Sequence, residues 1–113
     1  MNTERRARVR YTVNFSANMR VPSNAGVETF PVSAINMSAT SLEVSCDAAV
    51  FDCLQTQESF PYECELEFSL PEEGDACMMP CQVLRYRRLS QRHYQIVLDF
   101  LQELPIAPAA LAV

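Results

Sequence analysis

A strict alternation of apolar and polar side chains near the start of the chain limits the folds that it can adopt. From position 11 to position 21, every odd residue is apolar and every even residue is polar. The apolar positions are Tyr11, Val13, Phe15, Ala17, Met19 and Val21. Because successive side chains of a β-strand point to opposite faces, a period of two indicates a strand with one buried face. The sequence therefore predicts a sheet with one face packed on a core.

Shorter alternating runs predict further strands along the chain. They lie at about residues 30–34, 42–46, 64–70, 77–86 and 94–100. Residues that favour turns separate them at 22–26 and 71–75, and an arginine-rich tip at 87–92 predicts a second hairpin. The apolar positions change face near Leu84, which indicates a β-bulge, and Pro80 is expected at an edge or kink because proline cannot donate to a ladder.

One segment departs from the strand pattern. Residues 47–57 begin with Asp47, a plausible N-cap, and predict a short helical or irregular segment. The tail, residues 105–113, is broken by two prolines and is too short to predict a helix. Six short strands with no long helical pattern indicate an all-β fold, either an antiparallel barrel or a sandwich.

The length and the hydropathy predict one domain. A chain of 113 residues that is 49% hydrophobic fits a single core. We expect a flexible arginine-rich arm at 1–10, a β-domain at 11–104 and a short tail at 105–113. The start has no apolar signal region, and no stretch approaches about 20 apolar residues. These features predict a cytoplasmic protein without membrane insertion.

The charges predict a local anion site. All nine basic residues are arginines, and the net charge is -5, which argues against a nucleic-acid polymer or an anionic membrane as the partner. Eight arginines form two clusters, at 5–10 and 85–92. The guanidinium fork fits a phosphate or the edge of guanine. The alternative for the first cluster is a run of charge solvated by water. The second cluster is expected to be a solvated hairpin tip, and its alternative role is to supply distal contacts to a ligand or partner protein.

No pattern typical of an enzyme is present. The five cysteines form no Cys-x-x-Cys pair, and four of them lie at apolar positions of strand-like patterns, so they are expected to be small buried hydrophobes rather than metal ligands. His93 is the only histidine and is expected at the surface. Glu63, Glu65 and Glu67 alternate with apolar residues, so they predict a solvated outer face. We therefore expect a binding protein with no metal and no catalytic residues.

Two motifs resemble those of the PilZ family. Arg6 and Arg10 match the two arginines of its Arg-x-x-x-Arg entry motif, and Asn36 and Ser38 match its Asp/Asn-x-Ser-x-x-Gly motif. The spacing of the motifs and the closing run at 95–100 are also similar, so the resemblance covers about residues 4–101. It implies a six-stranded antiparallel β-barrel of the split-barrel type. In many members it also implies binding of the bacterial second messenger cyclic di-GMP.

The resemblance implies a site and a role. The candidate ligand-binding residues are Arg5, Arg6, Arg10, Asn36, Ser38 and Ser41. Cyclic di-GMP would change the surface offered to an unknown effector protein that controls motility, pili, biofilm or exopolysaccharide output. Ser41 stands where the family pattern has glycine, so a positive φ there would cost about 1 kcal/mol and its Cβ would crowd a ligand. The alternative function is a degenerate adaptor that acts by protein contacts without nucleotide, and the alternative role of Asn36 and Ser38 is to cap a turn.

Overall fold

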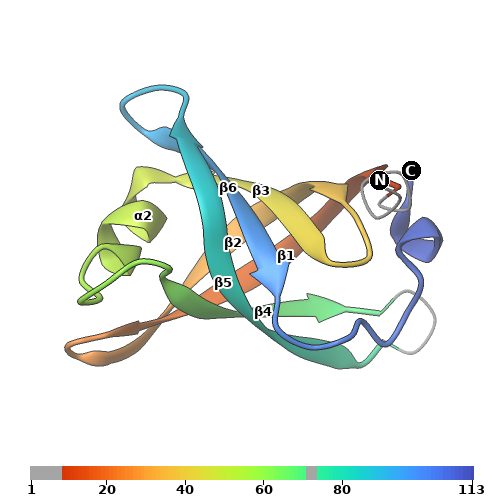
Figure 1. Cartoon of the computed structure of the whole chain (residues 1–113), viewed down its shortest axis with the longest axis horizontal. Helices are drawn as coiled ribbons and strands as arrows, with labels where there is room; N and C mark the ends of the chain where they lie inside the picture. Colours follow the sequence, from red (N-terminus) through yellow and green to blue (C-terminus); the bar gives the residue numbers. More distant parts are fainter. Residues whose placement is uncertain (1–8, 71–73) are drawn as a thin grey trace, which may run out of the picture.

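Six antiparallel strands close into a barrel. The structure is a computed structural model that describes residues 9–70 and 74–113. Its strands are β1 (Tyr11–Ser23), β2 (Gly26–Met37), β3 (Ser41–Asp47), β4 (Glu63–Ser69), β5 (Ala76–Arg88) and β6 (His93–Phe100). They pair in the order β1-β2-β3-β6-β5-β4 (Figure 1). This confirms the predicted all-β fold with six strands, and it decides for a barrel over a sandwich.

The alternation that opens the chain forms β1. Val13, Ala17, Met19 and Val21 are buried, and they join the core cluster inside the barrel. Burial of each large apolar side chain contributes roughly 1.5–3 kcal/mol, so the period of two is enforced by the core. β1 ends at Ser23 and β2 begins at Gly26, whose φ of +117° suits glycine alone. The predicted first hairpin is therefore confirmed.

The break between β2 and β3 is shorter than the sequence pattern indicates. The apolar alternation stops at Asn36 and resumes at Leu42, whereas β2 continues to Met37 and β3 begins at Ser41. A register shift between Ala34 and Asn36 explains the difference, because a bulge changes which side chains face inward. Only residues 38–40 lie outside the two strands.

The predicted features of β5 are also present. The register of β5 against β6 shifts between Val83 and Arg85, which confirms the bulge at Leu84. Pro80 precedes the ladder with β6, which begins at Cys81, and its carbonyl oxygen accepts a hydrogen bond from the N–H of Leu101. Pro80 also pairs with Glu65 inside the β4–β5 ladder, so it does not lie on an edge strand, but its missing donor falls beside β6, one residue before that ladder begins. Residues 71–73 of the predicted turn lie outside the described residues.

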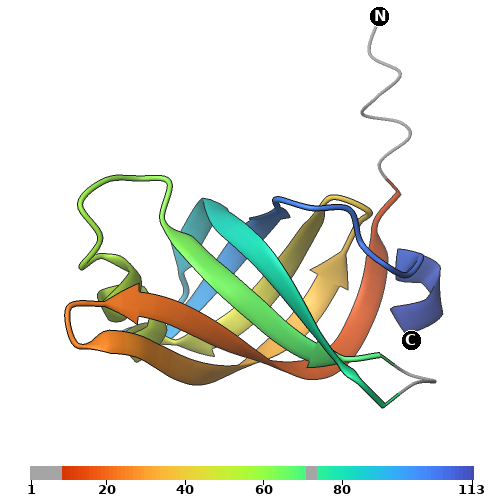
Figure 2. The same cartoon turned by 90° about the horizontal axis from the view of Figure 1, so that it is seen from below.

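In the described part of the chain, two short helices lie at opposite ends of the barrel (Figure 2). The first, α2 (Ala48–Leu54), is capped by Asp47, whose carboxylate accepts a hydrogen bond from the N–H of Ala49 at 2.9 Å. This confirms the predicted short helix and its N-cap. The second is η1 (Pro108–Leu111), a 3-10 helix in the tail. Neither helix of the described part is long and apolar enough to span a bilayer.

The end of the tail lies against the beginning of β1. Ala112 forms an isolated antiparallel bridge with Val13, and the N–H of Val113 donates to the carbonyl oxygen of Thr12. Figure 2 shows η1 beside this part of the barrel wall. The tail thus occupies an edge of β1 that β4 leaves open, since β4 pairs with β1 only from Asn18 to Arg20.

The strand cysteines Cys46, Cys64 and Cys81 are buried, as predicted, but Cys77 of β5 is only half-buried, and Cys53 of α2 is buried as well. Cys64 and Cys81 are cross-strand partners on β4 and β5. Burial raises the pKa of Cys64 from 9.0 to about 12, with a smaller contribution from the charge of Glu65. Burial raises the pKa of Cys81 as well. Both are therefore neutral thiols in the folded protein.

These raised thiol pKa values predict a loss of stability in alkali. Above pH 9 the unfolded chain releases thiol protons that the folded chain keeps, so the free energy of unfolding falls by roughly 1.4 kcal/mol per pH unit for each such thiol. The contribution is complete below pH 9 and is lost as the pH rises toward 12. Urea unfolding at pH 8 and about pH 10 measures the slope, and Cys64→Ala must reduce it. An equal slope in the variant would contradict this account.

Candidate functional site

The end of the arginine-rich arm meets the β2–β3 connection. Arg10 lies directly before β1, and its guanidinium donates two hydrogen bonds. The Nε atom donates to Oδ1 of Asn36, and the Nη1 atom donates to Oγ of Ser41 at 3.2 Å. These partners are 26 and 31 residues away in sequence. Three of the predicted site residues are therefore in direct contact.

Ser38 organises the loop that carries this contact. Its side chain is only 1% exposed, and its Oγ accepts hydrogen bonds from the N–H groups of Thr40 and Ser41 at 3.2 and 3.1 Å. A further hydrogen bond of 2.9 Å joins the Oγ atoms of Ser38 and Ser41. Ser38 therefore fixes the turn, and these two N–H groups already have an acceptor. Of the two roles open to Ser38, the turn-fixing role is the one seen in the fold.

Ser41 occupies the glycine position of the motif without backbone strain. No non-glycine residue in the described part of the chain has a positive φ. Ser41 begins β3 and pairs there with Asp99 of β6, so its backbone is extended. Its side chain belongs to the outward-facing set of β3, yet it is 6% exposed because Arg10 and Ser38 contact it. The strain that a positive φ would impose is absent, and the added hydroxyl is hydrogen-bonded.

The other two arginines of the predicted site, Arg5 and Arg6, lie outside the described residues.

Two carboxylates beside the site were not among the predicted residues. Glu43 is the cross-strand partner of Asn36, and Asp99 is the partner of Ser41. Directly opposed side chains have Cβ atoms about 4.5–5.5 Å apart, so both carboxylates border the groups that contact Arg10. The alternation of β3 places Glu43 outward, which was visible in the sequence, but its pairing with Asn36 was not. These charges compete with an anionic ligand for the arginine.

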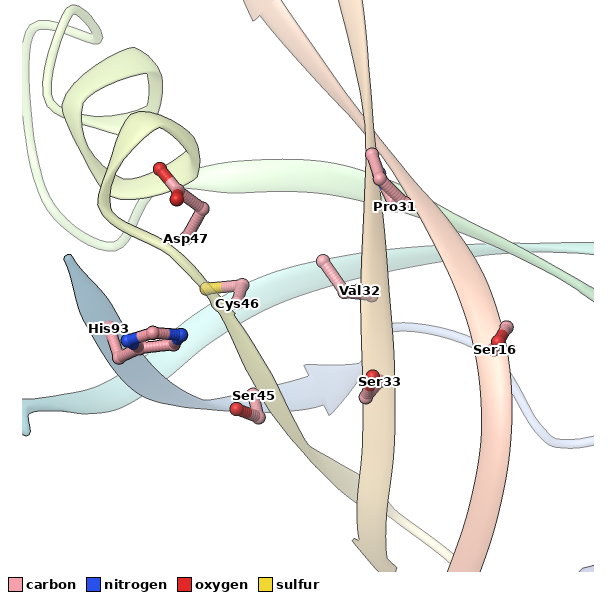
Figure 3. A pocket seen from close by; sticks show the side chains of 8 residues that line it. All are labelled: Ser16, Pro31, Val32, Ser33, Ser45, Cys46, Asp47 and His93. Carbon is pink, nitrogen blue, oxygen red and sulfur yellow. The ribbon is translucent and has the colours of Figure 1, made fainter.

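A separate shallow hollow crosses the outer wall between β1, β2, β3 and β6 (Figure 3). It has a volume of about 290 Å³ and brings together Ser45, Asp47 and His93. No hydrogen bond joins these three residues in the described structure: Asp47 accepts from the N–H of Ala49, and Nδ1 of His93 lies 3.4 Å from Oγ of Ser90. His93 is exposed, as predicted. The hollow therefore lacks the linked nucleophile and base of a catalytic triad.

The described residues form no cluster of metal-ligating side chains. Within residues 9–70 and 74–113, no group of three or more His, Cys, Asp or Glu side chains is placed to hold a metal ion.

Comparison with models of known protein families and with curated protein sequences gives no match. The candidate site is therefore argued from its own residues.

Proposed function

We propose that the protein is a PilZ-like receptor for cyclic di-GMP that changes its surface on binding and so regulates an effector protein. The observation that carries this proposal is the contact of Arg10 with both Asn36 and Ser41. It places the last arginine of the first motif against the second motif. A ligand bound by one motif is therefore within reach of the other.

Each residue has a chemical role in this proposal. The fork of Arg10 turns from its present partners to a phosphate or to the O6/N7 edge of guanine, and Arg5 and Arg6 supply further charge. Asn36 offers an amide that both donates and accepts at a base edge. Ser38 keeps the loop in place. Each charge-assisted bond contributes about 1.5–3 kcal/mol, so several such bonds are needed to offset the conformational entropy that is lost on binding.

An adaptor that does not bind nucleotide is the second candidate function. The observation that favours it is that Oγ of Ser41 contacts both Arg10 and Ser38, so a hydroxyl of the chain itself occupies the place that glycine would leave open. Glu43 and Asp99 favour it as well, because both add negative charge beside the site.

Titration calorimetry of the wild type and of Ser41→Gly separates the two functions. For a receptor, we expect saturable binding of cyclic di-GMP by the wild type and roughly tenfold tighter binding by the variant, because one hydrogen bond to Arg10 is removed. For an adaptor blocked by Ser41, only the variant binds. If neither folded protein gives saturable heat up to roughly 1 mM ligand, a limit of about −4 kcal/mol, the receptor proposal is overturned.

A further inference from the structure

The hairpin between β5 and β6 extends beyond the rest of the barrel (Figure 1). The ladder of β5 with β4 ends at Gln82, but its ladder with β6 continues to Arg88. Every residue from Leu84 to Arg88 is exposed although it belongs to a strand. Within the described residues, this part of β5 therefore has one edge with no neighbouring strand. An unpaired edge is able to accept an extended segment of another chain.

Apolar side chains are exposed along this hairpin and beside it. Leu84, Tyr86, Leu89 and Phe60 are 46–50% exposed. The ring of Tyr86 packs on the buried ring of Phe51, with 4.3 Å between the ring centroids. This contact holds Tyr86 in place before any partner protein binds. The ring centroid of Phe60 lies 6.3 Å from that of Tyr86. An incoming apolar side chain thus meets a pre-ordered aromatic surface.

The charge beside these side chains is entirely positive at the hairpin tip. Arg85, Arg87, Arg88 and Arg92 are all exposed, and the ion pair found among the described residues is elsewhere, between Arg20 and Glu65. Without these four arginines, the chain has five basic and 14 acidic residues, which gives 5 − 14 = −9. A long polyanion would be repelled by that remainder, whereas a short acidic segment touches only the hairpin. Charge therefore favours a protein segment over a nucleic acid.

A hollow of about 410 Å³ adjoins the arginines. Arg85, Tyr86 and Arg87 line it together with Gln95, whose side-chain oxygen accepts a hydrogen bond from Nη2 of Arg87 at 2.6 Å. Glu43 and Val97 complete the wall. The hollow gives room for a side chain beside Arg85 and Arg87, and the ring of Tyr86, which adjoins the hollow, lies near the rings of Phe51 and Phe60.

We propose that the β5–β6 hairpin is a docking site for an extended acidic segment of a partner protein. The segment lies along the free edge of β5 from Leu84 to Arg88. Its apolar side chains pack on Tyr86 and Phe60, and its carboxylates pair with the arginines. This surface lies toward the end of the barrel that carries α2, away from the β2–β3 loop (Figure 1). Glu43 borders both surfaces, because it lines the hollow and pairs with Asn36 of the proposed nucleotide site.

A labelled peptide of about ten residues, with glutamate alternating with leucine and phenylalanine, tests the proposal by fluorescence anisotropy. We expect saturable binding that weakens with salt and falls at least about tenfold in Arg88→Glu and in Leu89→Ser. Arg20→Glu is the matched control, because Arg20 is a partly exposed arginine on β1 outside the hairpin. The fold of each variant is checked by circular dichroism. Both hairpin side chains are exposed, so the variants are expected to fold.

Three outcomes would overturn the proposal. The first is equal binding of a peptide in which lysine replaces glutamate. The second is an equal loss of affinity in Arg20→Glu. The third is equally tight binding of a single-stranded oligothymidine of similar length, which would indicate a nucleic-acid surface. The peptide assay contains no cyclic di-GMP. A failure of the peptide to bind would therefore leave the cyclic di-GMP proposal unaffected.

Discussion

Replacement of Arg10 by alanine is expected to weaken the binding of cyclic di-GMP about 100-fold, which corresponds to about 2.7 kcal/mol. The guanidinium of Arg10 already lies at the second motif, against Asn36 and Ser41, so it needs only a local exchange of these partners to bind an anion there. One bidentate contact to a phosphate is worth about that free energy. Titration calorimetry of the wild type and the variant measures the difference.

Two further variants make this result specific. Arg10→Lys keeps the charge but loses the planar fork, so we expect an intermediate affinity. Arg20→Ala removes an arginine from the same end of the sequence, and its neighbour is Glu65 rather than the candidate site, so we expect wild-type affinity. A loss of affinity in Arg20→Ala as large as that in Arg10→Ala would contradict a local role for Arg10. Retained affinity in Arg10→Ala would remove Arg10 from the site.

The strands were predictable because their signal is local. Each strand buries one face in the same core, so apolar and polar residues alternate along β1 and β4, and this pattern can be recognised in the sequence alone. The order of strands depends on contacts between distant residues. For example, closure of the barrel rests on three paired positions, Asn18 to Arg20 of β1 with residues 65–67 of β4. Alternation alone could not distinguish this closure from a sandwich.

The β2–β3 connection shows where local reasoning fails. The apolar alternation of β2 stops before Asn36, but a bulge there lets Asn36 and Met37 continue the strand with the opposite set of positions facing inward. A bulge depends on the partner strand, which a single run of sequence does not contain. The same limit applies to Glu43 and Asp99, whose position beside the site follows from strand register.

The candidate site was predictable only in part. The two motifs named Arg10, Asn36, Ser38 and Ser41, and the structure brings these four residues together through hydrogen bonds. The prediction for Arg5 and Arg6 lies on residues that the structure does not describe. The role of Ser41 was not predictable, because its hydroxyl gains two partners that are distant or buried. A motif alone does not indicate whether a side chain at its glycine position, here Ser41, blocks the site or stabilises it.

Ser38→Ala is expected to lower the free energy of unfolding by about 1–3 kcal/mol. The change removes the acceptor of two backbone N–H groups and the partner of the Ser41 hydroxyl in a place that is 1% exposed. Alanine leaves a small space without restoring any of these bonds, and water has little access to replace them. Chemical denaturation measures the loss, and a fall in Tm of at least about 4 °C should accompany it.

A matched control and a double-mutant cycle test whether this loss comes from the loop. Ser33→Ala removes an exposed hydroxyl on β2, so we expect a change within about 0.5 kcal/mol. Ser38→Ala and Ser41→Ala share a hydrogen bond, so their effects on stability should not add. Full additivity would mean that the two hydroxyls act separately. In that case the loop that supports Arg10 would depend on backbone contacts, such as the N–H of Ser38 to the carbonyl oxygen of Ser41, rather than on the serine side chains.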